Sequence, residues 1–445
     1  MRTRVIVSCL LFGFALATTV SGQTRRDPRA VAMGGAYGSV SRGVFCIDYN
    51  PANLAIEHQY KSYRVWTGLN LSLSSNFLSL NGYHKYNGKN LEANGGALKQ
   101  EFLDEIPSDG WRFFADAHIA LPFVNYSFDN KAITSDLIAI GDLGLPRGLV
   151  RFIFNGNPIG ESLDIKFSEE VLLMSQWSYS MAFPVKDFLL GFTFKYLQGI
   201  GYIGLNPDSS YGYINTYFEQ GKNYIDGEAK YLFQQSIGGR GFAMDLGFST
   251  KEIDGYRFGL SLTNLFGRIY WGKRTLFSRI ADPEKILPWN GKYFQYEFQI
   301  NEASFDKFFK KDAYKNIFPG KGKSIDDSTK FSISYPTLAR FSVAKQFDEK
   351  TLISSDFVTG FENRLFSFGA WKWCIGAEIT RSPKWPVRVG ISLGGRDHRE
   401  LTFGSGYHTG FLHLDWAIGL NHGLWVTSAK GLNFSFSIYT TGKRK

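Results

Sequence analysis

The stretch that decides the fold reads Trp177-Ser-Tyr-Ser-Met-Ala-Phe183. Its odd-numbered residues are large and apolar, whereas Ser178, Ser180 and Ala182 are small. A period of two is typical of a β-strand whose two faces meet different surroundings. The segment therefore predicts a strand with one bulky apolar face and one small or polar face.

The same alternation recurs in later parts of the chain. Large apolar residues take every second position, with Gly, Ser, Thr, Asn and occasional charged residues between them, in 190–196, 242–248, 258–262, 331–335, 387–393, 412–420 and 432–438. In a soluble β-sandwich the exposed face would be rich in Lys and Glu. Here the second face suits a packed, polar interior, so we expect the bulky face to contact lipid. In hydrocarbon only a closed barrel satisfies the backbone groups of every strand.

Length and composition agree with such a barrel. The chain has 445 residues, including 48 Gly, 40 Phe, 23 Tyr and 10 Trp, a balance that favours β structure. A spanning strand takes about 9 to 11 residues, so residues 60–445 accommodate about 14 strands, with about 12 or about 16 as alternatives. We predict an all-β fold, a transmembrane antiparallel β-barrel. A soluble β-propeller would repeat every 40 to 50 residues or so, and no such repeat is found.

The first 22 residues predict a secretory signal peptide. Arg2 and Arg4 precede an apolar run over 5–17, which is shorter than the ~20 residues that a spanning helix needs. The predicted organisation is a signal peptide at 1–22, an N-terminal plug segment at 23–59 and a barrel at 60–445, located in the bacterial outer membrane. The formal charge of +10 is scattered and accompanies no nucleic-acid motif. We therefore expect outer-membrane lipid, and no nucleic acid, as a partner, with a monomer favoured.

Connections between the strands differ in length. The segments 184–187 and 251–255 have turn chemistry and predict short links between antiparallel strands. Longer polar segments, 206–239 and 268–328, predict outward loops. Within the second of these, helical spacing over 304–316 predicts a loop helix with Phe305, Phe308 and Phe309 on one side. A second short helix is predicted at 149–154.

The N-terminal segment is different in character. Small residues dominate from Ala30 to Ser41, Gly34-Gly35 allows a tight turn, and Asn50-Pro51 begins another. We predict a compact segment inside the lumen, with a loose arm outside the barrel as the alternative. The residues expected to form the plug or gate are Met33, Gly34, Gly35, Ala36, Asp48, Asn50, Pro51 and Ala52.

These residues also carry a resemblance. Met33-Gly34-Gly35-Ala36, followed by Asn50-Pro51-Ala52 and Leu54, resembles the N-terminal signature of the FadL-like outer-membrane proteins. That family includes long-chain fatty-acid and aromatic-hydrocarbon channels and the PorV-type accessory proteins of type IX secretion. Segments similar to its middle and late strands lie at 259–265, 385–390, 402–406 and 414–417. The resemblance implies a barrel of about 14 strands with a plugged lumen, nearer to a Bacteroidetes-type branch than to the fatty-acid channels.

Patterns of catalytic or metal chemistry are weak. The sequence has no HExxH, CxxC or Gly-Lys-Ser/Thr motif, and we expect no cofactor, no metal and no catalytic residue. Arg388, His413 and Asp415 fall on the polar faces of their strands and are the candidates for a lumenal network. For His413 and Asp415 a hydrogen-bonded pair is the favoured interpretation and a metal-ligand pair the alternative. Asp397-His398 reads as a solvated turn.

Two thiols remain after the signal peptide. Cys46 and Cys374 lie far apart in the sequence. Two buried free thiols are favoured, with a disulfide between them as the alternative.

Three functions fit the sequence. The first is passive uptake of hydrophobic small molecules through the barrel, which predicts a dry apolar pocket leading to the plug. The second is a non-transporting PorV-like scaffold that holds a secreted protein through outward loops, which predicts an exposed patch and a sealed lumen. The third is an outer-membrane hydrolase, which would need a catalytic triad at the barrel rim. Sequence favours the first and leaves the transported compound and the protein partner open.

Overall fold

The computed structural model describes residues 27–206, 208–272, 292–304, 321–325, 330–396 and 398–443, with backbone alone for 292–304 and 321–325. The predicted signal peptide, the predicted loop-helix residues Phe305, Phe308 and Phe309, and Asp397 lie outside these residues.

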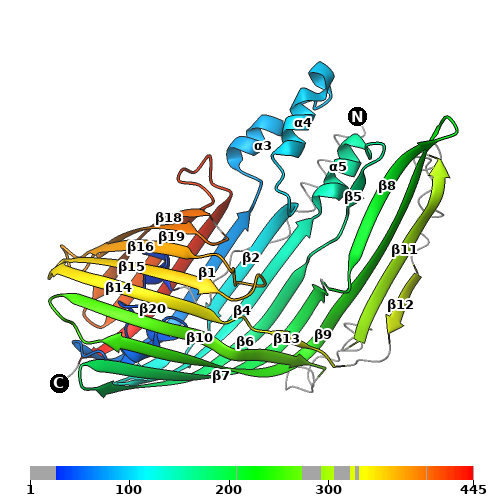
Figure 1. Cartoon of the computed structure of the whole chain (residues 1–445). Coiled ribbons are helices and arrows are strands. Elements are labelled where there is room, and N and C mark those ends of the chain that lie inside the picture. The colour runs from blue at the N-terminus through cyan, green and yellow to red at the C-terminus, as the bar shows by residue number, and fades with distance from the viewer. Residues whose placement is uncertain are drawn as a thin grey trace.

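A closed antiparallel barrel of fourteen strands dominates the described chain (Figure 1). In ring order the strands are β1 (Tyr60–Ser75), β2 (Trp111–Ala120), β4 (Lys131–Leu145), β6 (Glu170–Val185), β7 (Phe188–Leu205), β9 (Lys222–Thr250), β10 (Tyr256–Trp271), β14 (Leu338–Asp348), β15 (Thr351–Gly360), β16 (Lys372–Ile379), β17 (Val387–Gly394), β18 (Arg399–Thr409), β19 (Leu412–Asn421) and β20 (Gly431–Lys443). The ring closes where β20 pairs with β1, from Tyr60 opposite Lys443 to Ser74 opposite Gly431. The predicted fold class and strand number are confirmed.

The two ends of the barrel differ. At one end, the turn end, strands are joined by short links such as Lys186-Asp187 between β6 and β7, and 251–255 between β9 and β10, as predicted. The other end, the loop end, carries α3 (Leu80–Tyr86), η3 (Ala93–Gly96), α4 (Ala97–Asp104) and α5 (Arg147–Asn155). The helix predicted at 149–154 is therefore present as α5.

The segment 206–239, predicted to include outward loops, is mostly strand. It contains β8 (Tyr211–Glu219) and the first half of β9, which form a ribbon beyond the barrel together with β11 (Lys292–Ser304) and β12 (Lys321–Ile325) (Figure 1). The short strands β3 (Tyr126–Phe128), β5 (Ser162–Asp164) and β13 (Ser332–Ser334) complete the sheet. Pairing along β8 and β11 satisfies backbone groups that a loop would leave to water.

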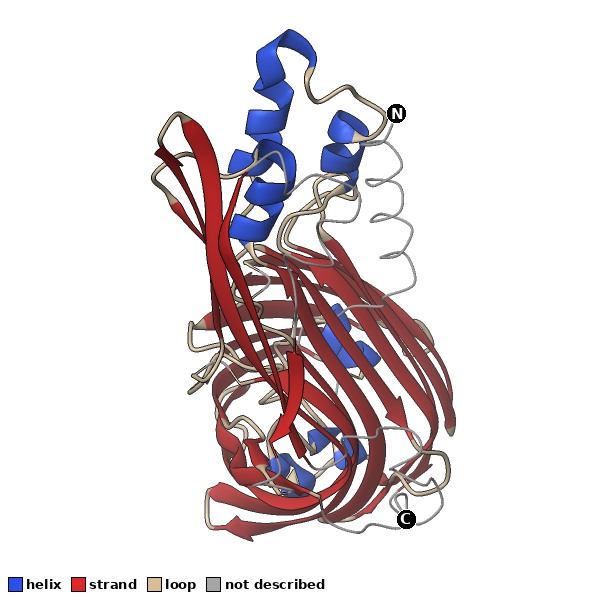
Figure 2. Cartoon of the chain, turned by 90° about the vertical axis from the view of Figure 1, so that its right-hand side faces the viewer, coloured by secondary structure: helices blue, strands red, loops and turns tan. Residues whose placement is uncertain are grey.

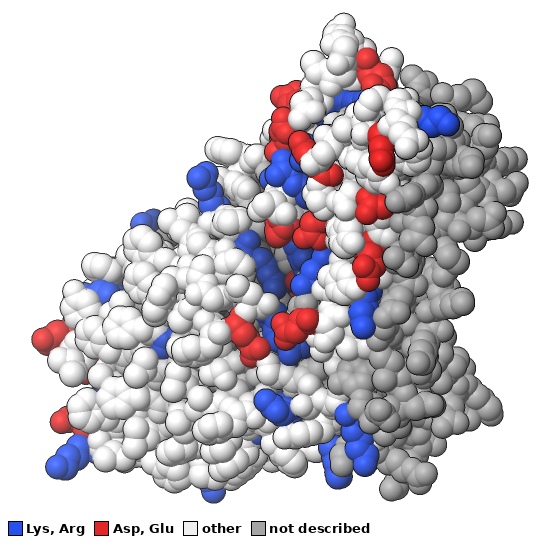
Figure 3. Space-filling view, turned by 45° about the vertical axis from the view of Figure 1, so that its right-hand side comes forward, with Lys and Arg blue, Asp and Glu red and all other residues white. Residues whose placement is uncertain are grey.

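The outer wall of the barrel is apolar. Side chains such as Phe194, Leu260 and Phe434 are exposed, while their neighbours Lys195, Ser261 and Ser435 are buried inside. The barrel wall in Figure 3 is correspondingly almost free of charged residues. This is the arrangement expected of a wall that faces hydrocarbon.

One predicted stretch has its faces reversed. Phe331, Ile333 and Tyr335 were assigned to the lipid face, but all three are buried inside the barrel. Ile333 lies opposite Ile269 in the ladder between β13 and β10, and both belong to an apolar cluster with Trp271. Alternation shows that a strand has two faces but not which one is inside, and near the loop end the interior is itself apolar.

The helices are short, and the two thiols are not bridged. Within the part of the chain that the structure describes, no helix is long and apolar enough to cross a membrane. Cys46 and Cys374 are buried and not joined by a disulfide, which agrees with the favoured interpretation of the sequence.

The apolar wall predicts an asymmetric response to added charge. Leu260 is half exposed on β10, so Leu260→Arg should lower the free energy of unfolding in phospholipid vesicles by about 2–4 kcal/mol. Phe218→Arg on the ribbon beyond the barrel should change it little. Denaturant titration of the two variants tests this, and an equal loss in both would contradict a lipid-facing wall at Leu260.

Candidate functional site

Residues 27–56 lie inside the ring of strands, and we call them the interior segment (Figure 2). The segment contains α2 (Pro28–Ala32), η1 (Gly43–Cys46) and η2 (Pro51–Ala55), and nearly all its residues are buried. None of the strand pairs in the described chain includes it. The segment is therefore held by side chains and packing, not by the sheet.

Glycines on the inner face make room for this segment. A Cβ added at Gly390 would lie 2.2 Å from the Gly34 nitrogen, and one at Gly191 would lie 2.1 Å from the Ala52 nitrogen. Real Cβ atoms do not approach backbone so closely, so only glycine fits at these positions. The small residues that alternate with bulky ones in the sequence thus allow the backbone of the interior segment to lie close to the barrel wall.

The predicted plug residues all lie in the interior segment. Met33 is fully buried at the end of α2, and Gly34 and Gly35 turn the chain with φ of 63° and 88°. Asn50 caps η2, because its Oδ1 accepts from the Ala52 nitrogen, and its Nδ2 donates 2.9 Å to the Phe248 carbonyl on β9. The remaining predicted plug residues, Ala36, Asp48, Pro51 and Ala52, are buried beside them.

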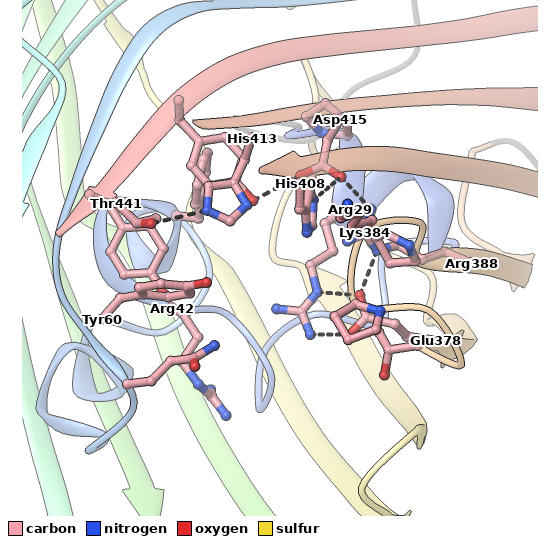
Figure 4. A pocket seen from close by; sticks show the side chains of 18 of the residues that line it. Arg29, Arg42, Tyr60, Glu378, Lys384, Arg388, His408, His413, Asp415 and Thr441 are labelled. Atoms are coloured by element: carbon pink, nitrogen blue, oxygen red, sulfur yellow. Dashed lines mark hydrogen bonds and ion pairs between the residues drawn. The ribbon is translucent and has the colours of Figure 1, made fainter. Parts of the chain in front are cut away.

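A first ionic group joins the segment to the wall near the turn end. Arg29 on α2 donates from Nε and Nη2 to the two Glu378 carboxylate oxygens at 2.8 and 2.7 Å. Glu378 on β16 also accepts from Arg388 Nε at 2.5 Å, and Arg388 Nη1 reaches Asp415 on β19 at 2.7 Å. The two predicted residues Arg388 and Asp415 are therefore in contact, in a chain of alternating charges (Figure 4). Burial lowers the pKa of Arg29, but the Glu378 carboxylate, Tyr37 and Tyr439 together hold that pKa above its usual value.

His413 does not pair with Asp415. Its Nε2 lies 3.0 Å from the Thr441 hydroxyl, and its ring stacks on Tyr439 at 4.8 Å. The histidine that contacts Asp415 is His408, with Nε2 3.1 Å from Oδ1. No group of three or more His, Cys, Asp and Glu side chains in the described residues is placed to hold a metal ion.

A second group fixes the turn that follows α2. Asp356 on β15 accepts from the backbone nitrogens of Tyr37 and Gly38 at 3.0 and 2.8 Å. Arg340 on β14 donates from Nη1 to Asp356 at 2.6 Å and to the Gly35 carbonyl at 2.9 Å. The backbone of the segment is thus held by one buried acid and one buried base.

A third group lies deeper. Lys195 on β7 is fully buried and donates to Asp48 of the segment, to Asp245 on β9 at 2.8 Å, and to Asn264 on β10 at 2.7 Å. Gln176 on β6 donates to the second oxygen of Asp48 at 3.0 Å. One ammonium thus contacts two carboxylates and an amide from three different parts of the chain.

Each end of the barrel also has a cavity. The turn-end cavity, of about 650 Å³, lies between the interior segment and strands that include β16, β17, β19 and β20 (Figure 4). Its lining includes Arg29, Arg42, Lys384, Arg388 and His413. Arg388, His413 and Asp415, the residues predicted to form a lumenal network, all line this cavity.

The loop-end cavity, of about 750 Å³, is lined by charged groups. Arg112 Nη2 lies 2.6 Å from Asp142, and Arg364 pairs with Glu170, which also accepts from Tyr202 at 2.8 Å. Figure 3 shows blue and red residues gathered in a hollow below the projecting elements. Tyr202 and Ile333 belong both to this lining and to the buried apolar cluster, so the cavity adjoins apolar side chains.

A family model described as Family of unknown function (DUF5723) matches residues 51–369. The chain belongs to this family. The match covers most of the barrel of this DUF5723 protein and begins within η2. No curated protein sequence matches.

Solved structures similar to the DUF5723 chain include two toluene transporters and a FadL homologue. The Ralstonia pickettii toluene transporter TbuX has 13% identity and a TM-score of 0.48, covering 94% of this chain and 98% of that one. The Pseudomonas putida toluene transporter TodX has 11% identity and a TM-score of 0.48, covering 96% and 100%. A Pseudomonas aeruginosa FadL homologue has 12% identity and a TM-score of 0.47, covering 96% and 100%. The sequence motifs indicate a resemblance to the FadL-like family, and these solved structures include a FadL homologue. The assignment of a fourteen-stranded barrel depends on the strand register alone.

Sequence reasoning missed several residues of the site. Glu378 stands on the inner face of β16 with Cys374 and Gly376, so the alternation could have found it. Lys195 was placed on the inner face, but its acidic partners Asp48 and Asp245 lie 147 and 50 positions away. Neither spacing nor composition signals such a pairing.

The close approach of the interior segment to Gly390 predicts that a side chain at this position displaces the segment. Gly390→Val should accelerate tryptic cleavage at Arg42 by at least about tenfold, because the added Cβ overlaps the backbone of Met33 and Gly34. Gly201→Val is the matched control, since a Cβ there meets no atom within 4 Å. Equal rates of tryptic cleavage in both variants would mean that glycine at position 390 is not needed to hold the interior segment in place.

The buried ionic group around Lys195 predicts a large loss of unfolding free energy when the lysine ammonium is removed. Lys195→Met leaves Asp48 and Asp245 buried without their counter-ion and should cost about 3–5 kcal/mol of unfolding free energy. Lys251→Met, in an exposed turn, should cost almost nothing. Urea unfolding measures both. Adding Asp48→Asn and Asp245→Asn to Lys195→Met should recover part of the loss, and a triple variant no better than the single one would argue against the ionic origin.

Proposed function

We propose that this protein is an outer-membrane channel for the passive uptake of hydrophobic small molecules, in which the interior segment is a plug. The observation that carries the proposal is the way the lumen is filled. Residues 27–56 occupy it without strand pairing, between one cavity at the turn end and one at the loop end. A segment held only by side chains can shift without breaking the barrel.

Orientation follows from the connections. Transmembrane barrels of the outer membrane have short periplasmic turns and longer external loops. The loop end, with α3, α4, α5 and the ribbon, then faces outward, and the turn end faces the periplasm. A solute enters through the loop-end cavity and leaves through the turn-end cavity.

The apolar cluster supports a hydrophobic solute. Tyr202, Trp271 and Phe331 pack together, with ring centroids 5.5 and 6.3 Å apart along Tyr202–Trp271–Phe331. Aromatic faces of this kind bind apolar groups and exclude water. Because Tyr202 also lines the loop-end cavity, an entering molecule meets this cluster first on its way towards the plug.

The cavity is not the dry pocket that the sequence hypothesis required. Its wall carries the ion pairs Arg112–Asp142 and Arg364–Glu170, and apolar contact begins only at the cluster. These two ion pairs make the entrance polar, and apolar contact follows only deeper in the barrel.

A scaffold that holds a secreted protein is the second candidate, and a specific observation favours it. The helices, the turn after α5 and the ribbon beyond the barrel expose apolar side chains that a solvated loop does not need, among them Leu80, Ile153, Ile159 and Phe218. Such side chains are typical of a protein-binding surface. The two candidates differ in whether the plug must move.

Uptake into liposomes tests the proposal. The purified barrel is reconstituted, and entry of a fatty acid and of toluene is compared between the wild type and a deletion of 33–52. We expect uptake by the wild type and a change of at least about tenfold on deletion, because the segment obstructs or directs the passage. Gly201→Val serves as the control with an intact plug.

The contrary outcome is also informative. Heat-modifiable gel mobility shows whether each barrel is folded. Folded protein that admits neither compound, with or without the segment, would exclude uptake of these compounds and favour the scaffold.

A further inference from the structure

The turn-end cavity has an excess of positive charge. Its lining contains seven Lys and Arg residues against four Asp and Glu residues. They are Arg29, Arg42, Lys350, Arg381, Lys384, Arg388 and Lys443 against Asp27, Glu349, Glu378 and Asp415. The loop-end cavity has the opposite balance, with three Arg against six acids. An anion is therefore favoured at the turn end and disfavoured at the loop end.

The carboxylates of the turn-end cavity are largely engaged. Glu378 and Asp415 bind Arg29 and Arg388, and Asp27 caps α2 by accepting from the nitrogens of Arg29 and Ala30. Positive charge beyond these pairs is thus left for another anion.

Arg42 is the clearest of the remaining cations. Its Nη1 donates 2.8 Å to the Ser41 carbonyl, and no salt bridge between the described residues includes it. Burial, and next the nearby Arg29, lower the pKa of Arg42. Both effects show a guanidinium whose charge the surrounding protein does not compensate.

Two buried polar atoms of the lining lack a partner among the described residues. They are His413 Nδ1 and Ser437 Oγ, in residues that are 3% and 2% exposed. Buried polar atoms are almost always hydrogen-bonded in native proteins, so an unpaired set in one cavity marks a place for a ligand. In the tautomer whose Nε2 accepts from the Thr441 hydroxyl, Nδ1 carries the proton and is a donor; in the other tautomer Nδ1 is an acceptor.

The rest of the lining is aromatic. Tyr60 lies 5.6 Å from the His413 ring, and Phe45 lies 5.0 Å from Tyr439, centroid to centroid. In Figure 4, Tyr60 and Arg42 lie on one side of the view and Glu378 and Arg388 on the other. A volume of about 650 Å³ is in the range of cavities that take small organic molecules.

We propose that the turn-end cavity is a binding site for a small organic acid, whose carboxylate contacts Arg42 and whose apolar or aromatic group packs against Tyr60 and Tyr439. His413 and Ser437 supply further hydrogen bonds to the same molecule. Since the cavity lies at the turn end and the loop end is acid-lined, the ligand reaches it from the periplasmic side. The site stands whether or not the barrel transports solutes. By contacting both Arg42 of the interior segment and the wall, a bound acid stabilises the seated segment.

Titration calorimetry of the folded barrel in detergent tests the site. The probes are phenylacetate, its neutral analogue phenylacetamide, acetate and inorganic phosphate. We expect phenylacetate to bind one molecule per barrel, at least about tenfold more tightly than each of the other three, because it alone has both the carboxylate and the ring.

Variants locate the binding. Arg42→Gln should weaken phenylacetate binding by at least about tenfold, whereas Arg42→Lys should keep part of it. Arg64→Gln is the matched control, since Arg64 lies exposed on β1. If Arg42→Gln does not give the heat-modifiable gel mobility of a folded barrel, His413→Phe replaces it, with a weakening of at least several-fold expected because the stacking on Tyr439 is kept.

Several results would overturn the inference. They are no phenylacetate binding to folded wild type, equal binding of phenylacetamide or of phosphate, and equal weakening by Arg64→Gln and Arg42→Gln. Phenylacetate binding without liposome uptake would uphold the site while removing the channel, so the two proposals fail separately.

Discussion

The space inside a ring of fourteen strands is the constraint on which the rest of the structure depends. Barrel diameter grows with strand number, and a ring of this size is wider than its own inward side chains can fill. Residues 27–56 occupy that space. The inner face is consequently built for contact with backbone, which explains Gly191 and Gly390, and its charges are placed to meet the segment rather than water.

Buried charge gives this contact its specificity. A charge taken out of water is costly unless it is paired and hydrogen-bonded. The segment meets three such groups, around Glu378 and Asp356 on the neighbouring strands β16 and β15, and around Lys195 on the distant strand β7. A segment shifted along the lumen would leave at least one of them unpaired. Packing against glycine alone would allow many positions, whereas the three groups together favour one.

The sequence predicted the wall better than its contents. Alternation from Trp177 onward, and the small residues between, were enough for fold class and the inward position of Arg388 and Asp415, and the length of 60–445 was enough for the strand number. The same rule failed at Phe331, Ile333 and Tyr335, because it took bulky residues to face lipid and the interior near the loop end is apolar. Pairings such as Asp48 with Lys195, and the role of His408 in place of His413, depend on where distant strands meet, which a local pattern does not contain.

The two thiols give the molecule a built-in reporter of its own state. Cys46 belongs to the interior segment and packs with Leu54 and Ala182, whereas Cys374 belongs to the wall, and neither is disulfide-bonded. A thiol reagent reaches Cys46 at a rate that measures departure of the segment from its seat. Cys374 lies on β16 and stays with the wall, so the ratio of the two labelling rates separates movement of the segment from opening of the barrel, without any introduced residue.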